Sequence, residues 1–503
     1  MVYVVTRHGA RNVLPKDAEL QENDSTGGPS LLPQGITASR AAGEAFRVRY
    51  LAHPACNRSL TCLASEGREG YGIVNAKGVG FSNFNTLARS SALDRTLRSA
   101  TAFLSGVFPL QAVPRAPLGM SPQVDVVLAQ TPPIYTVPDA NDWLIRAYTK
   151  CEAYQRRLAA WYKSQEFAAK EEATRGVREG LAQLEPQLNV SLVNWWNVYD
   201  AFNVWRNYGT GDIMPAISDA QFKQVASIAD WLETAKMRSN LTGNSLGGPL
   251  LGDLIGRLQA AAQHLLKGEK TRLGRLLLVS AHYNTQLALL SAMALDTALT
   301  PAQLPWLATL PATSSALAFE LHFDPSSRRL AVRMLYQDGP GQGYMPVPLP
   351  QCASPGGVRP NGDVDAAEAL AGPGACELSA FVRAYGGAAI DDAGTWCTVC
   401  ENAQMEACVA ARARGRGGVF AASGFANDNG SGGVSSDSGG GNGGGGSGEK
   451  VKVAMAVVTS ALGAGALAAG AVLWHVRRRE AKWEREAAEK ARAVQLHGSS
   501  VPL

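Results

Sequence analysis

The chain has 503 residues, a formal net charge of +4 and 18% charged residues. A chain of this length can hold one large domain or two ordinary ones. Its small net charge argues against a nucleic-acid-binding protein, whose basic residues usually gather in a stripe or along one helix, so we expect no nucleic-acid partner.

The chain opens on a short apolar segment that leads into a basic cluster. Val2 to Val5 are β-branched or aromatic residues that suit a buried strand, and Gly9 ends this run. Arg7, His8 and Arg11 follow within a few residues. The pattern predicts that these three side chains lie close together at the end of a strand.

Strand and helix patterns alternate downstream. Apolar residues have helical spacing over residues 35–51 and 91–108, and residues 274–295 change from a strand pattern to a helical one around His282. Residues 315–324 and 328–339 are typical of an antiparallel strand pair with DPSS at its turn.

A long stretch between the second and third of these patterns is richer in helical patterns and aromatic residues. It runs from about residue 137 to residue 272. We therefore predict an α/β core that carries a smaller, mostly helical cap as an insertion.

Cysteines and glycosylation sequons favour an oxidising compartment. The eight cysteines lie at positions 56, 62, 151, 352, 376, 397, 400 and 408, and the sequons lie at Asn23, Asn57, Asn189, Asn240 and Asn429. An even number of cysteines allows complete pairing, and Cys56 and Cys62 are close enough to bridge locally. Cys397 and Cys400 lack the second pair that a zinc finger needs. The sequence thus predicts a glycoprotein with disulfide bonds.

The composition changes after about Ala411. Residues 412–450 are dominated by Gly, Ser and Asn, which predicts a flexible stalk. Val453 to Trp474 is an uncharged apolar run that is long enough to cross a bilayer as one helix. Arg477 to Arg479 follow at once, so the positive-inside bias places the tail, residues 475–503, in the cytosol.

These features predict a single-pass type I membrane protein. Its ectodomain, residues 1–411, would be lumenal or extracellular. That orientation needs an N-terminal signal, yet the chain begins inside its first predicted strand with no basic or apolar leader. We expect the true N-terminus to lie upstream of Met1.

Three segments share one shape, in which Arg or His ends a strand or loop and a helix follows. They are TRHGAR (residues 6–11), ARSSALDRT (88–96) and SAHYNT (280–285). In an open α/β sheet, ligands bind at the carboxyl ends of the strands. We therefore expect the three corners to converge on one anion.

The residue types in these corners suit a phosphate group. Arg7, Arg11 and Arg89 carry permanent charge and forked donors that match phosphoryl oxygens. His8 and His282 are the candidates for a nucleophile and a fourth ligand, because a neutral imidazole attacks phosphorus without a separate base. The alternative for His8 is an ordinary hydrogen-bonded histidine at a strand end.

With these motifs the chain resembles the histidine acid phosphatase family, in the acid phosphatase and phytase branch of the histidine phosphatase superfamily. TRHGAR resembles the family signature, residues 31–50 its Leu-Thr-x-x-Gly helix, and residues 88–109 its Arg-Ser-Thr-x-x-Asp-Arg-Thr segment. The resemblance covers roughly residues 1–400. It implies a central mixed sheet flanked by helices, with the helical cap inserted, and a membrane-anchored form of the family here.

The resemblance also implies an activity and the roles of individual residues. The chain would be an acid phosphatase that hydrolyses phosphate monoesters through a phosphohistidine at His8. Arg7, Arg11, Arg89 and His282 would hold the phosphate, and no cofactor or metal would be required. The family layout further implies a homodimer on an endolysosomal or cell-surface membrane.

The same resemblance implies how the cysteines pair. The family pattern gives disulfides from Cys352 to Cys376 and from Cys151 to Cys400. Two pairs particular to this sequence would remain, from Cys56 to Cys62 and from Cys397 to Cys408.

Two departures from the family pattern bear on activity. The family's general acid, an Asp or Glu after the second histidine, is replaced by Tyr283, followed by Asn284. A tyrosine has a reference pKa near 10 and gives up its proton reluctantly, and a positioned acid contributes about 100-fold to 10,000-fold in rate. Near the first motif, Pro15 comes later than the corresponding proline of the family. In the segment over residues 88–96, Ala92 replaces an acidic residue. Both changes alter loop shape more than phosphate chemistry.

Tyr283 therefore leaves two hypotheses. Either the chain is an acid phosphatase with an atypical general-acid position, or it is a catalytically weak or inactive surface protein that binds phosphorylated ligands. A serine or cysteine nucleophile has little support, because the cysteines suit disulfides and no Gly-x-Ser-x-Gly elbow is present. No motif identifies the substrate. The predicted cap has no dense basic cluster that would bind a polyphosphorylated ring.

Overall fold

The computed structural model describes residues 1–13, 29–52, 63, 81–82, 85–109, 131–209, 214–268, 274–352 and 366–416. In this part of the chain an eight-stranded sheet has the order β3-β2-β4-β1-β5-β6-β7, with β8 paired to β6. The strands are β1 (Val2–Arg7), β2 (Thr86–Ser91), β3 (Ile134–Val137), β4 (Leu276–Ala281), β5 (Ala316–Asp324), β6 (Arg329–Gln337), β7 (Met345–Val347) and β8 (Cys376–Glu377).

The sheet is mixed, and β1 lies where the strand direction changes. β1 to β4 run parallel to one another, whereas β5 lies antiparallel to β1, and β6, β7 and β8 pair antiparallel. Val2 and Val4 are buried on one face of the sheet, and Tyr3 and Val5 are buried on the other. A strand buried on both faces explains the unbroken apolar run at the start of the sequence.

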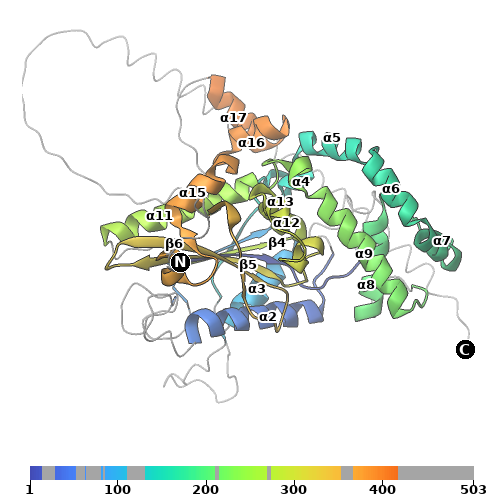
Figure 1. The fold of residues 1–503 in the computed structure, drawn as a ribbon, viewed down its shortest axis with the longest axis horizontal. Helices are drawn as coiled ribbons and strands as arrows, with labels where there is room; N and C mark the ends of the chain where they lie inside the picture. Colours follow the sequence, from blue (N-terminus) through green and yellow to red (C-terminus); the bar gives the residue numbers. More distant parts are fainter. Residues whose placement is uncertain are drawn as a thin grey trace, which may run out of the picture. The chain divides into compact units, whose positions relative to one another are not determined.

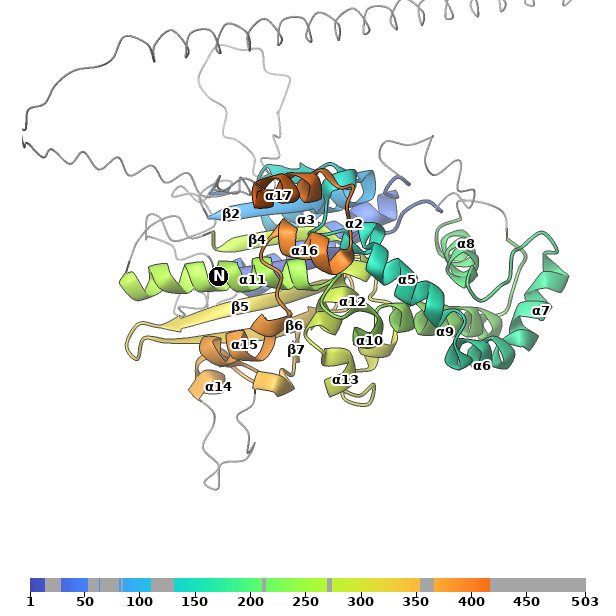
Figure 2. The same cartoon turned by 90° about the horizontal axis from the view of Figure 1, so that it is seen from above.

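Helices cover both faces of the sheet (Figures 1 and 2). On one face lie α2 (Pro33–Arg47), which continues into the π-helical turn η1 (Val48–Ala52), and α3 (Asp94–Val107). On the other face lie α11 (Gly248–Lys267), α12 (Tyr283–Ala292), α13 (Leu295–Ala298), α15 (Leu378–Tyr385), η6 (Gly386–Ala388) and α16 (Ala393–Cys400). The chain thus has the predicted mixed α/β architecture, in which helices flank a central sheet.

The described helices between residues 139 and 242 are η3 (Asp139–Asn141), α4 (Ala147–Lys150), α5 (Glu152–Trp161), α6 (Gln165–Ala173), α7 (Arg175–Leu184), α8 (Trp195–Tyr208), α9 (Asp219–Lys236) and α10 (Ser239–Thr242). In both cartoon views α6 to α9 extend beyond one end of the sheet (Figures 1 and 2). The segment predicted as a cap, residues 137–272, also includes α11, which lies along the sheet instead (Figure 2).

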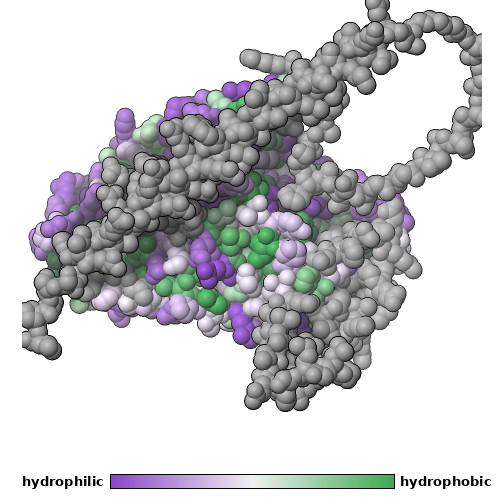
Figure 3. Space-filling model, turned by 180° about the vertical axis from the view of Figure 1, so that it is seen from behind, coloured by the Kyte–Doolittle hydropathy of each residue, from purple (hydrophilic) through white to green (hydrophobic). Residues whose placement is uncertain are grey.

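Four short or peripheral elements complete the described part. They are η4 (Pro305–Ala308), η5 (Pro350–Cys352), α14 (Ala366–Ala371) and α17 (Glu406–Arg416). Large hydrophobic side chains that remain exposed are scattered over different elements: Ile36, Val48, Tyr135, Leu184, Val193, Met345 and Val409. On the face drawn in Figure 3, hydrophobic and hydrophilic residues are correspondingly intermixed.

The element boundaries match the sequence patterns with one informative difference. The strand-to-helix change predicted around His282 is exact, because β4 ends at Ala281 and His282 is the N-cap of α12. The second predicted helix begins at Asp94 rather than at Ser91, because Ser91 is the last residue of β2.

Three of the four expected disulfides are present. Cys151 pairs with Cys400, Cys352 with Cys376, and Cys397 with Cys408. The fourth expected pair, Cys56 and Cys62, lies outside the described residues.

The predicted membrane anchor also lies outside the described part of the chain. This holds for nearly all of the stalk over 412–450 and for the span over 453–474 and the tail over 475–503. Among the described helices, none has both the length and the hydropathy needed to cross a bilayer.

Candidate active site

The pairing of β1 with β4 brings two histidines together. The two strands run parallel with Arg7 opposite Ala281, so the next residue of each strand, His8 and His282, leaves the same end of the sheet. The backbone N–H of His8 donates to the carbonyl oxygen of Ala281 at 3.1 Å, which extends the register by one step. The two imidazole rings lie edge to face with centroids 5.4 Å apart, and both are buried.

One hydrogen bond fixes the tautomer of His8. Its Nδ1 lies 2.8 Å from the carbonyl oxygen of Gly9, which can only accept a hydrogen bond. Nδ1 therefore carries the proton in the neutral ring, and Nε2 keeps its lone pair. A nucleophilic histidine needs this arrangement, because the attacking nitrogen must be unprotonated.

Gly9 sits at a close approach that only glycine allows. A Cβ atom at this position would lie 2.4 Å from the carbonyl oxygen of Gly35 in α2. The Gly9 N–H donates to Ser99 Oγ at 2.9 Å. The turn after His8 is thus fixed by direct packing on α2 and α3, and the His8 ring is held through its bond to the Gly9 carbonyl.

His282 is oriented by a chain of hydroxyl groups. The Thr96 hydroxyl donates to the backbone carbonyls of Ser91 and Leu93. It therefore accepts from the Ser91 hydroxyl, 2.9 Å away, and Ser91 Oγ in turn accepts from His282 Nε2 at 3.0 Å. Because the chain runs in this direction, the proton of neutral His282 lies on Nε2. Neither serine nor threonine was singled out from the sequence.

Positive charge surrounds both imidazoles. Burial is the largest cause that lowers the pKa of His8 well below its usual value, followed by the charges of Arg95, Arg7 and Arg11. The pKa of His282 is lowered in the same way, again by burial first and by Arg95 next. Both effects favour the neutral form of the two rings, in which the lone pair of His8 is available.

Arg95, in the second motif, is the arginine whose charge most lowers the pKa of both histidines. It lies in the first turn of α3, just past the end of β2, and is buried. Burial, and then the charge of Arg11, lower its pKa to about 9. The Nε atoms of Arg95 and Arg7 are both buried, and neither has a hydrogen-bond partner among the described residues. Unpartnered buried donors of positive charge are suited to an anion.

Arg89, which the sequence placed in the phosphate clamp, also has a buried Nε with no hydrogen-bond partner among the described residues. It lies within β2, two residues before the strand ends, and its Nη2 is 3.5 Å from Asp142 Oδ1. Arg89 is not among the charges that most lower the pKa of either histidine.

The other two predicted arginines are held by neighbours beyond the sheet. Arg11 Nη1 forms an ion pair of 2.9 Å with Asp200 of α8, and both side chains are buried. Arg7 donates to the carbonyl oxygen of Pro311, and its guanidinium carbon lies 5.2 Å from the centre of the Tyr283 ring. Asp200 was not predicted from the sequence.

Tyr283, which the resemblance puts in the place of the general acid, donates its hydroxyl proton to a carboxylate of the cap. It is the first residue of α12, and its hydroxyl donates to Glu233 Oε2 of α9 at 2.7 Å. Glu233 also accepts from Lys236 Nζ at 2.7 Å and is buried. Burial, followed by the Glu233 carboxylate, raises the pKa of Tyr283 well above its usual value. This phenol therefore holds its proton tightly.

Arg146 adds a further charge to the site. It forms an ion pair with Asp139 and is one of the charges that lower the pKa of His282. The ring of Tyr148 lies between the two, 6.2 Å from the His282 ring and 6.0 Å from the Arg146 guanidinium carbon. Within the described ranges, no group of three or more His, Cys, Asp or Glu side chains could hold a metal ion.

The fold is mixed α/β, and this cluster of neutral imidazoles and guanidinium groups is suited to binding an anion. Residues 22–337 match the model of the histidine phosphatase superfamily (branch 2), so the chain belongs to this superfamily. The matched range begins after the segment that carries Arg7, His8 and Arg11.

Relatives among known proteins are acid phosphatases. The lysosomal acid phosphatases of Xenopus laevis and Homo sapiens are each 25% identical to this chain, over 70% of it and over 72% and 73% of their own lengths. Prostatic acid phosphatase of Homo sapiens is 26% identical over 53% of this chain and 63% of its own length.

The solved structures that resemble the chain include bacterial phytases. A phytase from Citrobacter braakii has a TM-score of 0.51 and 15% identity, covering 79% of this chain and 98% of its own. A Hafnia alvei phytase in complex with tartrate has a TM-score of 0.51 and 14% identity, covering 79% of this chain and 97% of its own. At these identities the likeness shows a common fold.

Proposed function

We propose that this chain hydrolyses phosphate monoesters through a phosphohistidine intermediate at His8. The observation that carries the proposal is the pair of buried, neutral imidazoles at the carboxyl ends of β1 and β4, surrounded by guanidinium groups. Membership of the superfamily and the acid phosphatases among its relatives support phosphomonoester substrates.

The reaction takes place in two displacements at phosphorus. In the first, the lone pair of His8 Nε2 forms a bond to phosphorus, while the bond to the ester oxygen breaks and the leaving group takes that electron pair. In the second, a water oxygen bonds to phosphorus and releases a proton to the surrounding water, while the P–N bond breaks and its electron pair returns to Nε2, which yields inorganic phosphate. Two such steps replace one difficult displacement.

The phosphoryl oxygens are held by Arg7, Arg11, Arg95 and His282 in this proposal. Arg95 takes the place that the sequence gave to Arg89, because it lies past the strand end and acts on both histidines. Fixed positive charge in a buried site stabilises the charge on the equatorial oxygens during transfer. Asp200 holds Arg11 in position and limits the surplus positive charge of the site.

Proton donation to the leaving group is the weak part of this site. The Tyr283 hydroxyl is bonded to Glu233 and its pKa is raised, so we propose that it contributes little as a general acid. Substrates whose leaving group departs without a proton, such as aryl phosphates, should then be hydrolysed much faster than alkyl phosphates.

A second candidate function follows from the same observation. If the missing acid makes turnover negligible on every substrate, the guanidinium groups and imidazoles would still bind phosphorylated ligands. The two functions are separated by p-nitrophenyl phosphate hydrolysis by the full chain from about pH 4 to about pH 8, beside a His8→Ala variant, because nitrophenolate needs almost no protonation. Release that depends on His8 supports the enzyme, and equal background rates in both proteins support the binding protein.

We also propose that the site works outside the cytosol. The described disulfides fit an oxidising compartment, and two of the relatives are named lysosomal acid phosphatases. In this proposal residues 1–411 form the ectodomain, 412–450 a stalk, 453–474 a membrane span and 475–503 a cytosolic tail. Cleavage of the ectodomain by a protease added outside intact cells, with the tail protected, would test this topology.

A further inference from the structure

Helix α8 carries three side chains on one face that lie beside the candidate active site. They are Trp196, Tyr199 and Asp200. Residues three or four positions apart share a face of a helix, so these side chains leave α8 in similar directions. Its other sides pack in the hydrophobic core through Trp195, Val198, Ala201 and Phe202. This packing fixes the direction in which the first face points.

Two of the three side chains lie beside the arginines of the first motif. Asp200 forms the ion pair of 2.9 Å with Arg11. Burial raises the pKa of Tyr199 to about 12, and the next largest influence is the charge of Arg7, which opposes this rise. Burial likewise lowers the pKa of Arg7, and Tyr199 is the group that most opposes that shift. The face of α8 is therefore next to the end of β1.

The rings of Tyr283, Trp196 and Tyr199 form a continuous row, which we call the aromatic wall. The centre of the Tyr283 ring lies 5.2 Å from the guanidinium carbon of Arg7. The Trp196 ring lies 5.0 Å from that of Tyr283 and 5.6 Å from that of Tyr199, centre to centre. The wall thus begins at a proposed phosphate ligand and continues along α8.

The part of the aromatic wall that belongs to α8 is open to a ligand. Trp196 and Tyr199 are only partly buried, whereas Tyr283 is 8% exposed. Because its pKa is about 12, Tyr199 is uncharged near neutral pH. Exposed aromatic faces of this kind bind other aromatic rings, with ring centres about 4.5–7 Å apart.

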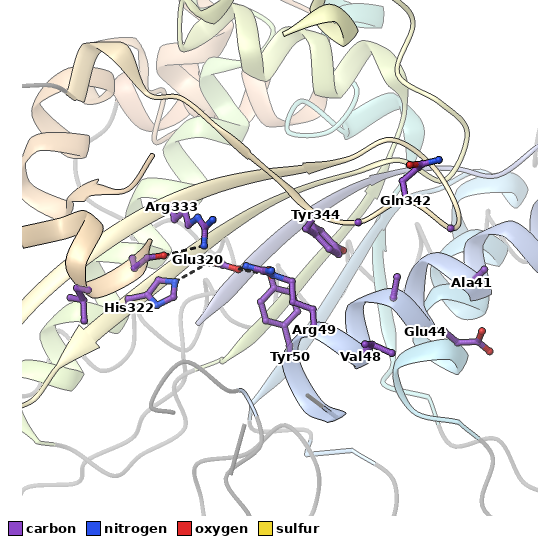
Figure 4. Close-up of a pocket in the computed structure, with 15 residues that line it drawn as sticks. Ala41, Glu44, Val48, Arg49, Tyr50, Glu320, His322, Arg333, Gln342 and Tyr344 are labelled. Carbon is purple, nitrogen blue, oxygen red and sulfur yellow. Dashed lines mark hydrogen bonds and ion pairs between the residues drawn. The ribbon is translucent and has the colours of Figure 1, made fainter. Parts of the chain in front are cut away.

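The cavity drawn in Figure 4 is too far away to hold the group that is bonded to the phosphoryl group. Glu320, which lines it, pairs with Val2 at the start of β1, whereas His8 follows the end of that strand. The intervening residues, at about 3.3 Å each, separate the two places by roughly 20 Å. The Glu320 carboxylate accepts from Arg49 Nη2 at 2.8 Å and from His322 Nε2 at 2.9 Å. The rest of a substrate must therefore lie among residues near the other end of β1.

The position of a leaving group follows from that of the phosphoryl group. The attacking nitrogen and the leaving oxygen are roughly in line at phosphorus, so the leaving oxygen points away from His8. His8 lies at the end of the sheet, and α8 lies beyond that end (Figures 1 and 2). Two steps of about ring-contact size connect Arg7 to Trp196. A phosphoryl group on Arg7 and an aryl ring on Trp196 can thus belong to one small molecule.

We propose that the aromatic wall is the leaving-group subsite and selects phosphate monoesters of phenols. This inference rests on the proposed function, which places the phosphoryl group between His8 and the arginines. The aryl ring packs on Trp196 and Tyr199. Phenols depart more readily than alkyl alcohols, which suits a site whose Tyr283 proton is held by Glu233.

Phenylphosphonate and methylphosphonate test the subsite without turnover, because their P–C bond is not hydrolysed as an ester bond is. By calorimetry, phenylphosphonate should bind the full chain at least about fivefold more tightly than methylphosphonate. Trp196→Ala should reduce this ratio to less than about twofold, and Tyr199→Ala should reduce it in part, while methylphosphonate binds both variants as it binds the wild type.

Trp205→Ala is the matched control and should keep the full ratio of affinities. Trp205 lies on the same helix, nine positions after Trp196, and helical geometry places it on the opposite side of α8. Thermal unfolding identifies which variants are folded. If Trp196→Ala does not fold, Tyr199→Ala decides the question.

Two results would overturn the inference and leave the proposed function intact. One is equal affinity of the wild type for the two phosphonates. The other is a ratio that stays unchanged in folded Trp196→Ala and Tyr199→Ala. The proposed function fails separately, if p-nitrophenyl phosphate hydrolysis does not depend on His8 while the ratio of phosphonate affinities still depends on Trp196.

Discussion

Replacement of Tyr283 by aspartate tests whether a missing proton donor limits this site. The tyrosine hydroxyl is bonded to Glu233 at 2.7 Å, so its proton is not available to a leaving group. An aspartic acid here would sit in a buried place near a carboxylate, and both conditions favour its protonated form. A protonated carboxyl beside the phosphoryl group is what a general acid requires.

The size of the effect follows from what the substitution removes and adds. A hydrogen bond between a hydroxyl and a carboxylate contributes about 1.5–3 kcal/mol to stability, and the buried ring, whose centroid lies 5.0 Å from that of Trp196, adds to the loss. We expect Tyr283→Asp to lower the free energy of unfolding by about 3–5 kcal/mol. A positioned acid contributes about 100-fold to 10,000-fold, so kcat/KM on an alkyl phosphate should rise at least about tenfold.

The assay compares glycerol 2-phosphate with p-nitrophenyl phosphate for the wild type, Tyr283→Asp and Tyr283→Phe. The phenylalanine variant loses the same hydrogen bond without gaining an acid, so it separates the cost in stability from the effect on proton transfer. A fall of about 100-fold on glycerol 2-phosphate in folded Tyr283→Phe would show that Tyr283 donates after all. No gain in folded Tyr283→Asp would refute the reasoning by pointing to another donor.

Three further predictions rest on other contacts. Arg95→Gln should lower kcat/KM for p-nitrophenyl phosphate by about 100-fold to 1,000-fold and Arg89→Gln by less than about tenfold, and the reverse order in steady-state kinetics would restore Arg89 to the clamp. Because the pKa of Glu320 is lowered from 4.5 to about 2, its contribution of about 3 kcal/mol is complete above pH 4.5 and disappears as the pH falls through about 2. Denaturant unfolding of wild type and Glu320→Gln should therefore differ at pH 5 and converge near pH 2, and a difference independent of pH would contradict this origin. Loss of the Cys151 to Cys400 disulfide in a paired Cys→Ala variant should cost about 2–5 kcal/mol, and an unchanged unfolding temperature would disprove its structural role.

The sequence predicted most of what depends on local pattern. The apolar run before Arg7 and the change of period at His282 placed both histidines at strand ends, because these signals lie within a few residues of the groups they position. The mixed sheet and two disulfide pairs, Cys151–Cys400 and Cys352–Cys376, followed from the family resemblance, and the Cys397–Cys408 pair followed from the cysteines that these pairs leave over.

The remainder depends on contacts between distant segments. The choice between Arg89 and Arg95 needs the last residue of β2, and patterns place strand ends only to within a few residues. The hydrogen bond from Tyr283 to Glu233 joins residues on different helices, so no local sequence pattern predicts it. Glu320 and Arg333 line one cavity because the register of β5 and β6 places them opposite each other, and no local pattern predicts this register.

Direct detection of a phosphorylated His8 would test the central claim. The full chain would be mixed with p-nitrophenyl phosphate, quenched in alkali because the P–N bond is labile in acid, and digested for mass spectrometry. The account predicts a phosphoryl group on the peptide that contains His8, formed as nitrophenolate is released and lost as phosphate appears. A turning-over enzyme with phosphate on another residue, or with no phosphoenzyme while His8→Ala stays fully active, would contradict it.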